Sequence, residues 1–193
     1  MLIKDEFTVA EPVEKVWRFF DDIPQVATCL PGTELTDDLG GGKYEGRVIV
    51  RMGPVSLRFA GTAHITERDD AAKRLVLQAH GADEKGRGRA SMVVTASLVR
   101  SGPGTTVRVA QDLQVFGAAA QYGRGMISDV TSVLMRDFAV NLENRIASTE
   151  RGDAPARAAA VPASGFTVGL RATMLALKRV FRRFFAPFQD NPS

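Results

Sequence analysis

The fold of this chain is decided by residues 55–66, VSLRFAGTAHIT. From Val55 to Ile65, every second residue is apolar or glycine, and the residues between them are mostly polar. This period of two is typical of an antiparallel strand that has one face on a core and the other in water. The Gly53-Pro54 pair in front of it predicts a turn from a preceding strand.

The same alternation predicts further strands on both sides of this segment. We expect them over residues 4–9, 44–52, 74–79, 90–99 and 105–116. After the last strand, the apolar residues of 118–147 gather on one side of a helical wheel, which predicts one long helix. Strands followed by one helix predict an α+β fold, in which the helix packs across a curved antiparallel sheet of about six to seven strands.

Two short helices are expected directly after the first strand. Pro12 suits the first turn of a helix. The apolar residues of 13–20 follow the i, i+3, i+4, i+7 spacing of one buried helix face. A second helix over 21–30 is expected to end at Pro31-Gly32, a common stop signal.

Composition narrows the class of protein. The chain has 193 residues, of which 45% are hydrophobic and 24% charged, and this excludes a fibrous or wholly disordered chain. The single cysteine excludes a disulfide framework and a cysteine-based zinc site, and the two histidines leave no basis for expecting a metal centre. The N-terminus, MLIKDEFTV, lacks the apolar core of a signal peptide, so we expect a cytoplasmic protein. Charged residues interrupt every long apolar stretch, so a membrane-spanning helix is not expected.

Charge is distributed unevenly along the chain. The residues after Glu150 include seven basic and two acidic residues, a net +5, and because the whole chain carries +3, residues 1–150 carry −2. Residues 149–165 are small, polar and interrupted by prolines, which is typical of a linker. We therefore expect a folded domain over 1–148, a flexible linker over 149–165 and a separate helix over 166–188.

Residues 166–188 give a basic amphipathic helix on a helical wheel, with five phenylalanines on its apolar side. Such helices lie in the headgroup plane of anionic membranes. The residues expected to bind the membrane are Phe166, Leu170, Met174, Leu177, Lys178, Arg179, Phe181, Arg182, Arg183, Phe184, Phe185 and Phe188. A groove on a partner protein and packing on the chain's own domain are the alternatives. Nucleic acid is not expected, because the phenylalanines would be left exposed.

Five segments carry a resemblance to a known family. They are EPVEKVW (11–17), CLPGTEL (29–35), MGPVSLRFAG (52–61), GTTVRV (104–109) and FGAAAQYGRGM (116–126). Together they resemble the CoxG subunit of carbon monoxide dehydrogenase, a branch of the START-like (SRPBCC) helix-grip superfamily. The resemblance implies a cavity for an apolar ligand between the sheet and the long helix. It also implies association with a molybdenum-dependent CO dehydrogenase or a related respiratory oxidoreductase, and it supplies no catalytic residues.

The inward faces of the strands and of the long helix are expected to line this cavity. The residues expected to contact a ligand are Val48, Val50, Phe59, Met92, Val94, Val109, Gln111, Val115, Gly123, Met126, Ile127, Val130, Leu134 and Phe138. Gln111 interrupts an apolar face, so its amide must find a partner. Either the backbone satisfies this amide, or the amide anchors the carbonyl of a ligand. For Gly123 the alternatives are close packing of the helix against the sheet and space for a ligand to enter.

Cysteine and histidine side chains are given structural roles. Cys29 has no neighbouring basic residue to form a thiolate, so a buried, unreactive cysteine is expected. His64 is expected on the polar face of its strand and His80 at the end of a strand, both at the surface. No residue is therefore assigned a catalytic or metal-binding role.

Together, these features predict a non-enzymatic, membrane-associated protein that binds an apolar molecule. The favoured ligand is a respiratory quinone such as menaquinone, held without covalent attachment, because an enzyme that passes electrons from CO to the respiratory chain needs access to a quinone confined to the membrane. The expected location is the inner face of the cell membrane, on anionic lipid. A pure adaptor that recruits the enzyme without a ligand is the alternative, and a cyclase-like enzyme is less favoured.

Overall fold

A computed structural model describes residues 1–150 of the protein. The expected linker and membrane-binding helix lie outside these residues. Strand β1 (Leu2–Val9) leads into helices α1 (Val13–Phe19) and α2 (Ile23–Cys29). Six strands follow: β2 (Thr33–Gly40), β3 (Lys43–Met52), β4 (Val55–Asp69), β5 (Arg74–Asp83), β6 (Gly88–Ser101) and β7 (Gly104–Gly117). A 3₁₀ turn, η1 (Ala118–Tyr122), precedes the long helix α3 (Gly123–Glu150).

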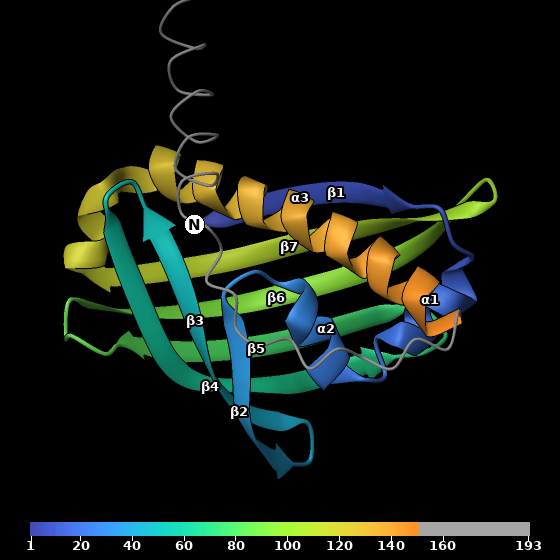
Figure 1. The fold of residues 1–193 in the computed structure, drawn as a ribbon, viewed down its shortest axis with the longest axis horizontal. Helices are drawn as coiled ribbons and strands as arrows, with labels where there is room; N and C mark the ends of the chain where they lie inside the picture. The colour runs from blue at the N-terminus through green and yellow to red at the C-terminus, as the bar shows by residue number, and fades with distance from the viewer. Residues whose placement is uncertain (151–193) are drawn as a thin grey trace, which may run out of the picture.

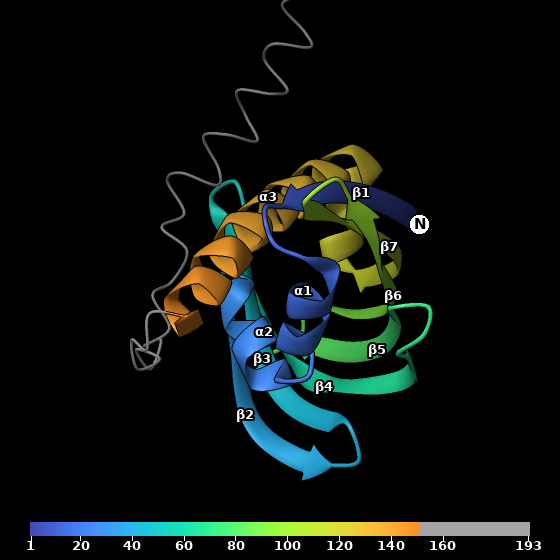
Figure 2. The same cartoon turned by 90° about the vertical axis from the view of Figure 1, so that its right-hand side faces the viewer.

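The strands form one antiparallel sheet in the order β1-β7-β6-β5-β4-β3-β2. The sheet curves, and α3 lies diagonally across its concave side (Figure 1). Helices α1 and α2 close one end of the concave side (Figure 2). This arrangement is the helix-grip fold, and it confirms the α+β architecture expected from the sequence.

The two short helices form as local sequence signals predict. Pro12 lies directly before α1, as the helix cap, and its fixed backbone suits that position. At the start of α2, the Asp22 side chain accepts a hydrogen bond of 3.0 Å from the backbone N–H of Gln25, which satisfies a donor that the helix leaves free. Helix α2 is tied to α3 because Asn141 Nδ2 donates to the carbonyl oxygen of Cys29 at 3.0 Å.

The sequence missed one strand and misplaced several boundaries. Strand β2 was not expected, and β5 runs on to Asp83, so His80 lies inside a strand rather than at its end. The long helix begins at Gly123 instead of at residue 118. Its start is delayed because Gly117 and Gly123 both take positive φ angles, 78° and 74°, on either side of η1.

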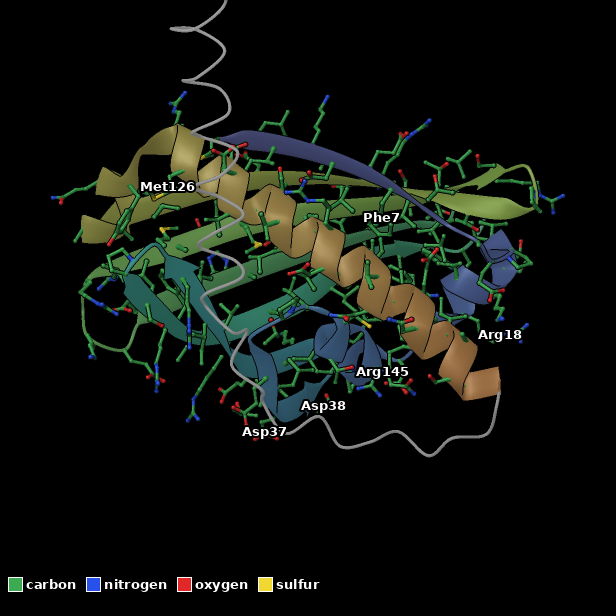
Figure 3. The ribbon with its side chains drawn as sticks, turned by 45° about the horizontal axis from the view of Figure 1, so that its top comes forward. Phe7, Arg18, Asp37, Asp38, Met126 and Arg145 are labelled. Carbon is green, nitrogen blue, oxygen red and sulfur yellow. The ribbon has the colours of Figure 1, made fainter. Side chains whose placement is uncertain are left out.

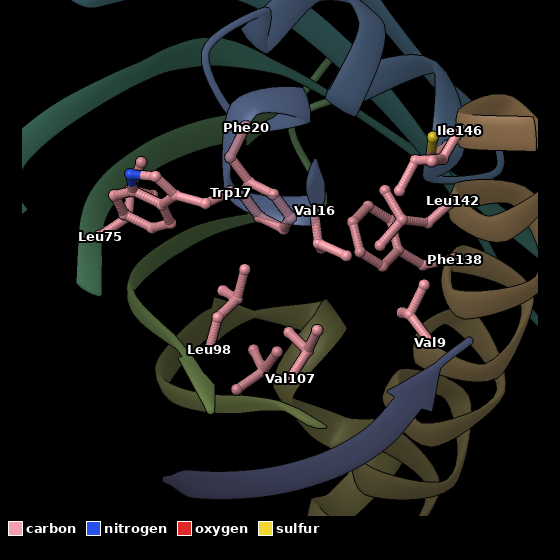
Figure 4. Packing of buried hydrophobic residues seen from close by; sticks show 12 residues of the cluster. Val9, Val16, Trp17, Phe20, Leu75, Leu98, Val107, Phe138, Leu142 and Ile146 are labelled. Atoms are coloured by element: carbon pink, nitrogen blue, oxygen red, sulfur yellow. The ribbon is translucent and has the colours of Figure 1, made fainter. Parts of the chain in front are cut away.

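The core divides into two clusters of buried side chains. The first joins α1, α2 and the C-terminal half of α3 to the sheet (Figure 4) and comprises Val9, Val16, Trp17, Phe20, Cys29, Leu75, Leu98, Val107, Val109, Phe138, Leu142 and Ile146. The second lies near the start of α3 and comprises Met52, Leu57, Ala119, Ile127 and Val130. The concave face between the two clusters is where a ligand site can form.

Candidate functional site

Small residues follow one another across the middle of the concave face. The strand register places Ala90, Gly81, Gly61 and Gly46 side by side on β6, β5, β4 and β3. A Cβ atom on Gly61 would lie 1.9 Å from the carbonyl oxygen of His80, so only glycine fits there. These residues let the strands approach closely where the sheet bends, and they also leave this part of the face without large side chains.

Apolar side chains next to this row are not sealed from water. Val48 and Met92 point to the concave face but belong to neither core cluster, and both are only half-buried. Phe59, opposite Val48 in the register, is half-buried as well. A half-exposed apolar surface inside a fold gains free energy when a ligand covers it, by about 25 cal/mol per Å².

One buried polar side chain on the same face has a nitrogen atom without a hydrogen-bond partner. Gln111 on β7 is 7% exposed, and its Nε2 atom makes no hydrogen bond to any described residue. The backbone therefore does not satisfy the Nε2 donor, contrary to what the first of the two hypotheses for Gln111 requires. A buried donor left unpaired costs about 1–3 kcal/mol, which a ligand acceptor would recover.

Two further buried oxygen atoms on the concave side lack a hydrogen-bond partner among the described residues. They are Asp5 Oδ2 on β1 and Thr33 Oγ1 on β2. Neither residue was expected in the site from the sequence. Asp5 could have been found, because it occupies an inward position in the alternation of Ile3, Phe7 and Val9. Thr33 gave no such signal, because its strand was not expected.

The structure brings most of the expected ligand-contacting residues onto the concave side. Those that pack into or against the first cluster are Val94, Val109 and Phe138. Those that pack into or against the second cluster are Val50, Phe59, Val115, Ile127, Val130 and Leu134. Whether any of them touches a ligand stays a prediction.

Two of the expected residues do not face the interior. Met126 lies in the first turn of α3, at the N-terminal end of the helix in Figure 3, and 43% of its surface is exposed. Gly123 is also exposed, and a Cβ atom there would meet nothing within 4 Å. Close packing against the sheet therefore does not explain Gly123. Its positive φ angle, which ends the 3₁₀ turn, does.

The outer face of the sheet carries a hollow of about 700 Å³ that the sequence did not predict. Its lining side chains alternate with those of the concave face, and they include Ala60, His80, Ala82, Arg89, Ser91 and Phe116. Phe116, one of these lining residues, is 56% exposed. This hollow lies on the side of the sheet opposite α3.

The expectation that Cys29 is a buried, unreactive cysteine was confirmed. Its side chain is fully buried, and burial raises the pKa of the thiol to about 11, so the thiol stays protonated and unreactive. Within residues 1–150, no group of three or more histidine, cysteine, aspartate and glutamate side chains could hold a metal ion. In the same residues, no helix is long and apolar enough to cross a membrane.

A curved antiparallel sheet that holds one long helix on its concave side defines a helix-grip, START-like protein. The chain belongs to the CoxG family of carbon monoxide dehydrogenase subunits, whose family model matches residues 6–147. No curated protein matches the chain.

Solved structures share the fold at low sequence identity. A conserved protein from Geobacillus kaustophilus is 20% identical with a TM-score of 0.69, covering 77% of this chain and 97% of that chain. TTHA0849 from Thermus thermophilus is 18% identical with a TM-score of 0.55, covering 77% and 99%. The Zhui aromatase/cyclase from Streptomyces sp. R1128 is 16% identical with a TM-score of 0.51, covering 81% and 98%. These likenesses concern the fold alone.

Proposed function

We propose that the protein is a non-catalytic carrier that holds an apolar ligand on the concave face of its sheet and serves a CO dehydrogenase or a related respiratory oxidoreductase. One observation carries the proposal. Between two packed clusters, the half-buried Val48 and Met92 lie on the same face as the buried, unpartnered amide of Gln111. An apolar surface with few polar anchors is the usual form of a small-molecule site.

A respiratory quinone such as menaquinone is the ligand that fits this role best. Its ring and prenyl chain would cover the apolar surface, and a ring oxygen would accept a hydrogen bond from Gln111 Nε2. The family name links the chain to CO dehydrogenase, whose electrons must reach a quinone confined to the membrane. A protein that takes the quinone from the membrane would supply this access.

The basic amphipathic sequence of residues 166–188 supports a location at the inner face of the cell membrane. Each basic residue near an anionic surface contributes about 1 kcal/mol to binding. A fully buried phenylalanine contributes roughly 1.5–3 kcal/mol more. In this proposal residues 149–165 act as a tether, so the carrier domain can reach both the lipid and the enzyme.

The test is extraction of bound lipid from the purified full-length protein followed by mass spectrometry. We expect menaquinone to be recovered, and thermal shift with a short-chain menaquinone analogue to raise the Tm of lipid-free protein. Gln111→Leu should reduce this shift. Its matched control is Gln114→Leu, an exposed position on the outer face of the same strand. A protein without extractable lipid and without any shift would refute the carrier function.

The outer-face hollow favours a second function, that of a pure adaptor. The exposed Phe116 lies next to Arg89 in this hollow, and aromatic and arginine side chains are the usual anchors of protein interfaces. An adaptor would bind the oxidoreductase through this surface and need no ligand. If lipid-free protein binds the enzyme as tightly as the wild-type protein does, and Phe116→Ala loses this binding, the adaptor function is supported.

A further inference from the structure

Gln111 and Asp5 belong to neighbouring strands and share the concave face. In the register of β1 and β7, Ile3 is opposite Gln111 and Asp5 is opposite Val109, so Asp5 is the diagonal neighbour of Gln111 on the same face. Diagonal neighbours in an antiparallel pair are roughly 7–8 Å apart, within reach of long side chains. Helix α3 passes over this point, since Ser132 Oγ donates to Asp5 Oδ1 at 3.3 Å.

The two unpartnered atoms have opposite requirements. Gln111 Nε2 is a donor that needs an acceptor, and Asp5 Oδ2 is an acceptor that needs a donor. A ketone oxygen could satisfy only Gln111, because it carries no hydrogen. A hydroxyl group both accepts and donates, so one hydroxyl between the two side chains satisfies both.

We propose that the site recognises an aromatic hydroxyl, which means that it prefers the hydroquinone form of its ligand to the oxidised quinone. This inference rests on the proposed carrier function and deepens it. A quinone in the same pose would place a ketone lone pair against the Asp5 carboxylate and leave that oxygen unpaired. The carrier would therefore hold the reduced form more tightly.

The experiment measures dissociation constants of three naphthalene probes for the lipid-free full-length protein by calorimetry. 1-Naphthol carries the hydroxyl, 1-methoxynaphthalene keeps the oxygen acceptor without the hydrogen, and 1,4-naphthoquinone presents ketone oxygens. A hydrogen bond to a charged group predicts that 1-naphthol binds about tenfold or more tightly than the other two. The same comparison, made anaerobically between naphthoquinone and its hydroquinone, should show the same order.

Variants separate the two anchors. Asp5→Leu should abolish the preference for 1-naphthol over 1-methoxynaphthalene, and Gln111→Leu should weaken the binding of both. Ser132→Ala removes only the helix contact to Asp5 and should keep the preference. Gln114→Leu on the outer face should change nothing. If Asp5→Leu does not fold, the three wild-type constants decide the question alone.

The outcomes distinguish this inference from the carrier function. Equal affinities for the three probes, or a preference that persists in Asp5→Leu, would overturn hydroxyl recognition and leave the carrier function standing. Protein that binds no probe and yields no extractable lipid would overturn both.

Discussion

The guanidinium of Arg68 lies 4.3 Å from the centre of the Trp17 ring. Trp17 Nε1 donates to Asp70 Oδ1 at 2.8 Å, and Arg68 Nη1 donates to the carbonyl oxygen of Phe20 at 3.1 Å. The Trp17 hydrogen bond, more than any other contact, lowers the pKa of Asp70. These contacts fasten α1 to the end of β4, and so hold closed one end of the concave face.

Replacing Arg68 tests this fastening. Arg68→Ala removes the stacking, two ion pairs and the bond to Phe20, and should lower the free energy of unfolding by about 1–3 kcal/mol. Arg68→Lys keeps the charge but not the planar stacking, so it should recover only part of the loss. Urea unfolding measures both. Arg47→Ala, at an exposed pair with Glu84, is the control and should cost less than about 1 kcal/mol. Equal losses at positions 68 and 47 would contradict the role of Arg68.

The Asp83 carboxylate gives the fold a pH dependence. Arg87 Nε donates to Asp83 Oδ2 and Arg87 Nη2 donates to Asp83 Oδ1, both at 2.8 Å. The backbone N–H groups of Arg58, Lys85 and Arg87 donate to the same carboxylate. Together these hydrogen bonds, those of the Arg87 side chain above all, hold the pKa of Asp83 far below its usual range. A depressed folded-state pKa adds stability that is fully present above the unfolded pKa of about 4 and is lost as the pH falls below it.

Asp83→Asn should therefore be less stable than wild type at pH 7 and approach it at pH 2–3. Thermal unfolding across this range measures the difference. Glu84→Gln is the neighbouring control, because its side chain is exposed, and it should leave the acid slope of wild type unchanged. A difference between Asp83→Asn and wild type that stays constant down to pH 2 would contradict the linkage.

Replacing Gly61 and Gly125 by alanine should change the free energy of unfolding in opposite directions. Gly61→Ala places a Cβ against the His80 carbonyl, so β4 and β5 must separate, and we expect a loss of about 1–3 kcal/mol or more. Gly125→Ala meets no atom within 4 Å in α3 and should gain about 0.5–1 kcal/mol. Chemical denaturation of both variants checks the opposite signs. If Gly61→Ala is neutral, the sheet does not need close approach at this point.

Alternation and helical periodicity predicted six strands and the three helices, because each of these elements buries one face. There is a physical reason why strand β2 was not predicted. Its register against β3 shifts after Leu35, and Asp37 and Asp38 beyond it are exposed, far out on the hairpin (Figure 3). Without a regular buried face, period-two patterning disappears. The helix start was misplaced because the alanines of η1 favour a helix, whereas backbone geometry at Gly117 and Gly123 delays it.

The candidate site was predictable in outline only. Gln111 stood out as a polar interruption in an apolar strand face. Its unpartnered donor and the nearby acceptor on Asp5 depend on how β1 pairs with β7, two strands at opposite ends of the domain sequence. Such long-range pairing leaves no local signal in the chain.

A tryptophan at position 134 should block the ligand site. Leu134 is half-buried and packs at the border of the second cluster, so a larger side chain can extend over the open part of the concave face. Leu134→Trp should fold and lose the Tm increase that a menaquinone analogue gives wild type. Val130→Trp is a different case, because Val130 is 4% exposed inside the cluster, and overpacking there should cost about 1–3 kcal/mol. An undiminished ligand shift in Leu134→Trp would place the site elsewhere.

The last prediction concerns residues 151–193, which follow the domain. The last buried core residue is Ile146, so deleting 151–193 should leave the Tm of the domain within a few degrees of wild type. The deletion should abolish sedimentation with vesicles that contain anionic lipid.

Within the full chain, replacing Lys178, Arg179, Arg182 and Arg183 with glutamine should weaken vesicle binding and flatten its salt dependence, since screening acts on charges. Replacing Phe181, Phe184 and Phe185 with serine should weaken binding at every salt concentration. Vesicle binding that survives the deletion, or equal salt sensitivity in the two sets of variants, would refute the expected division of residues 166–188 into charged and apolar membrane-binding residues.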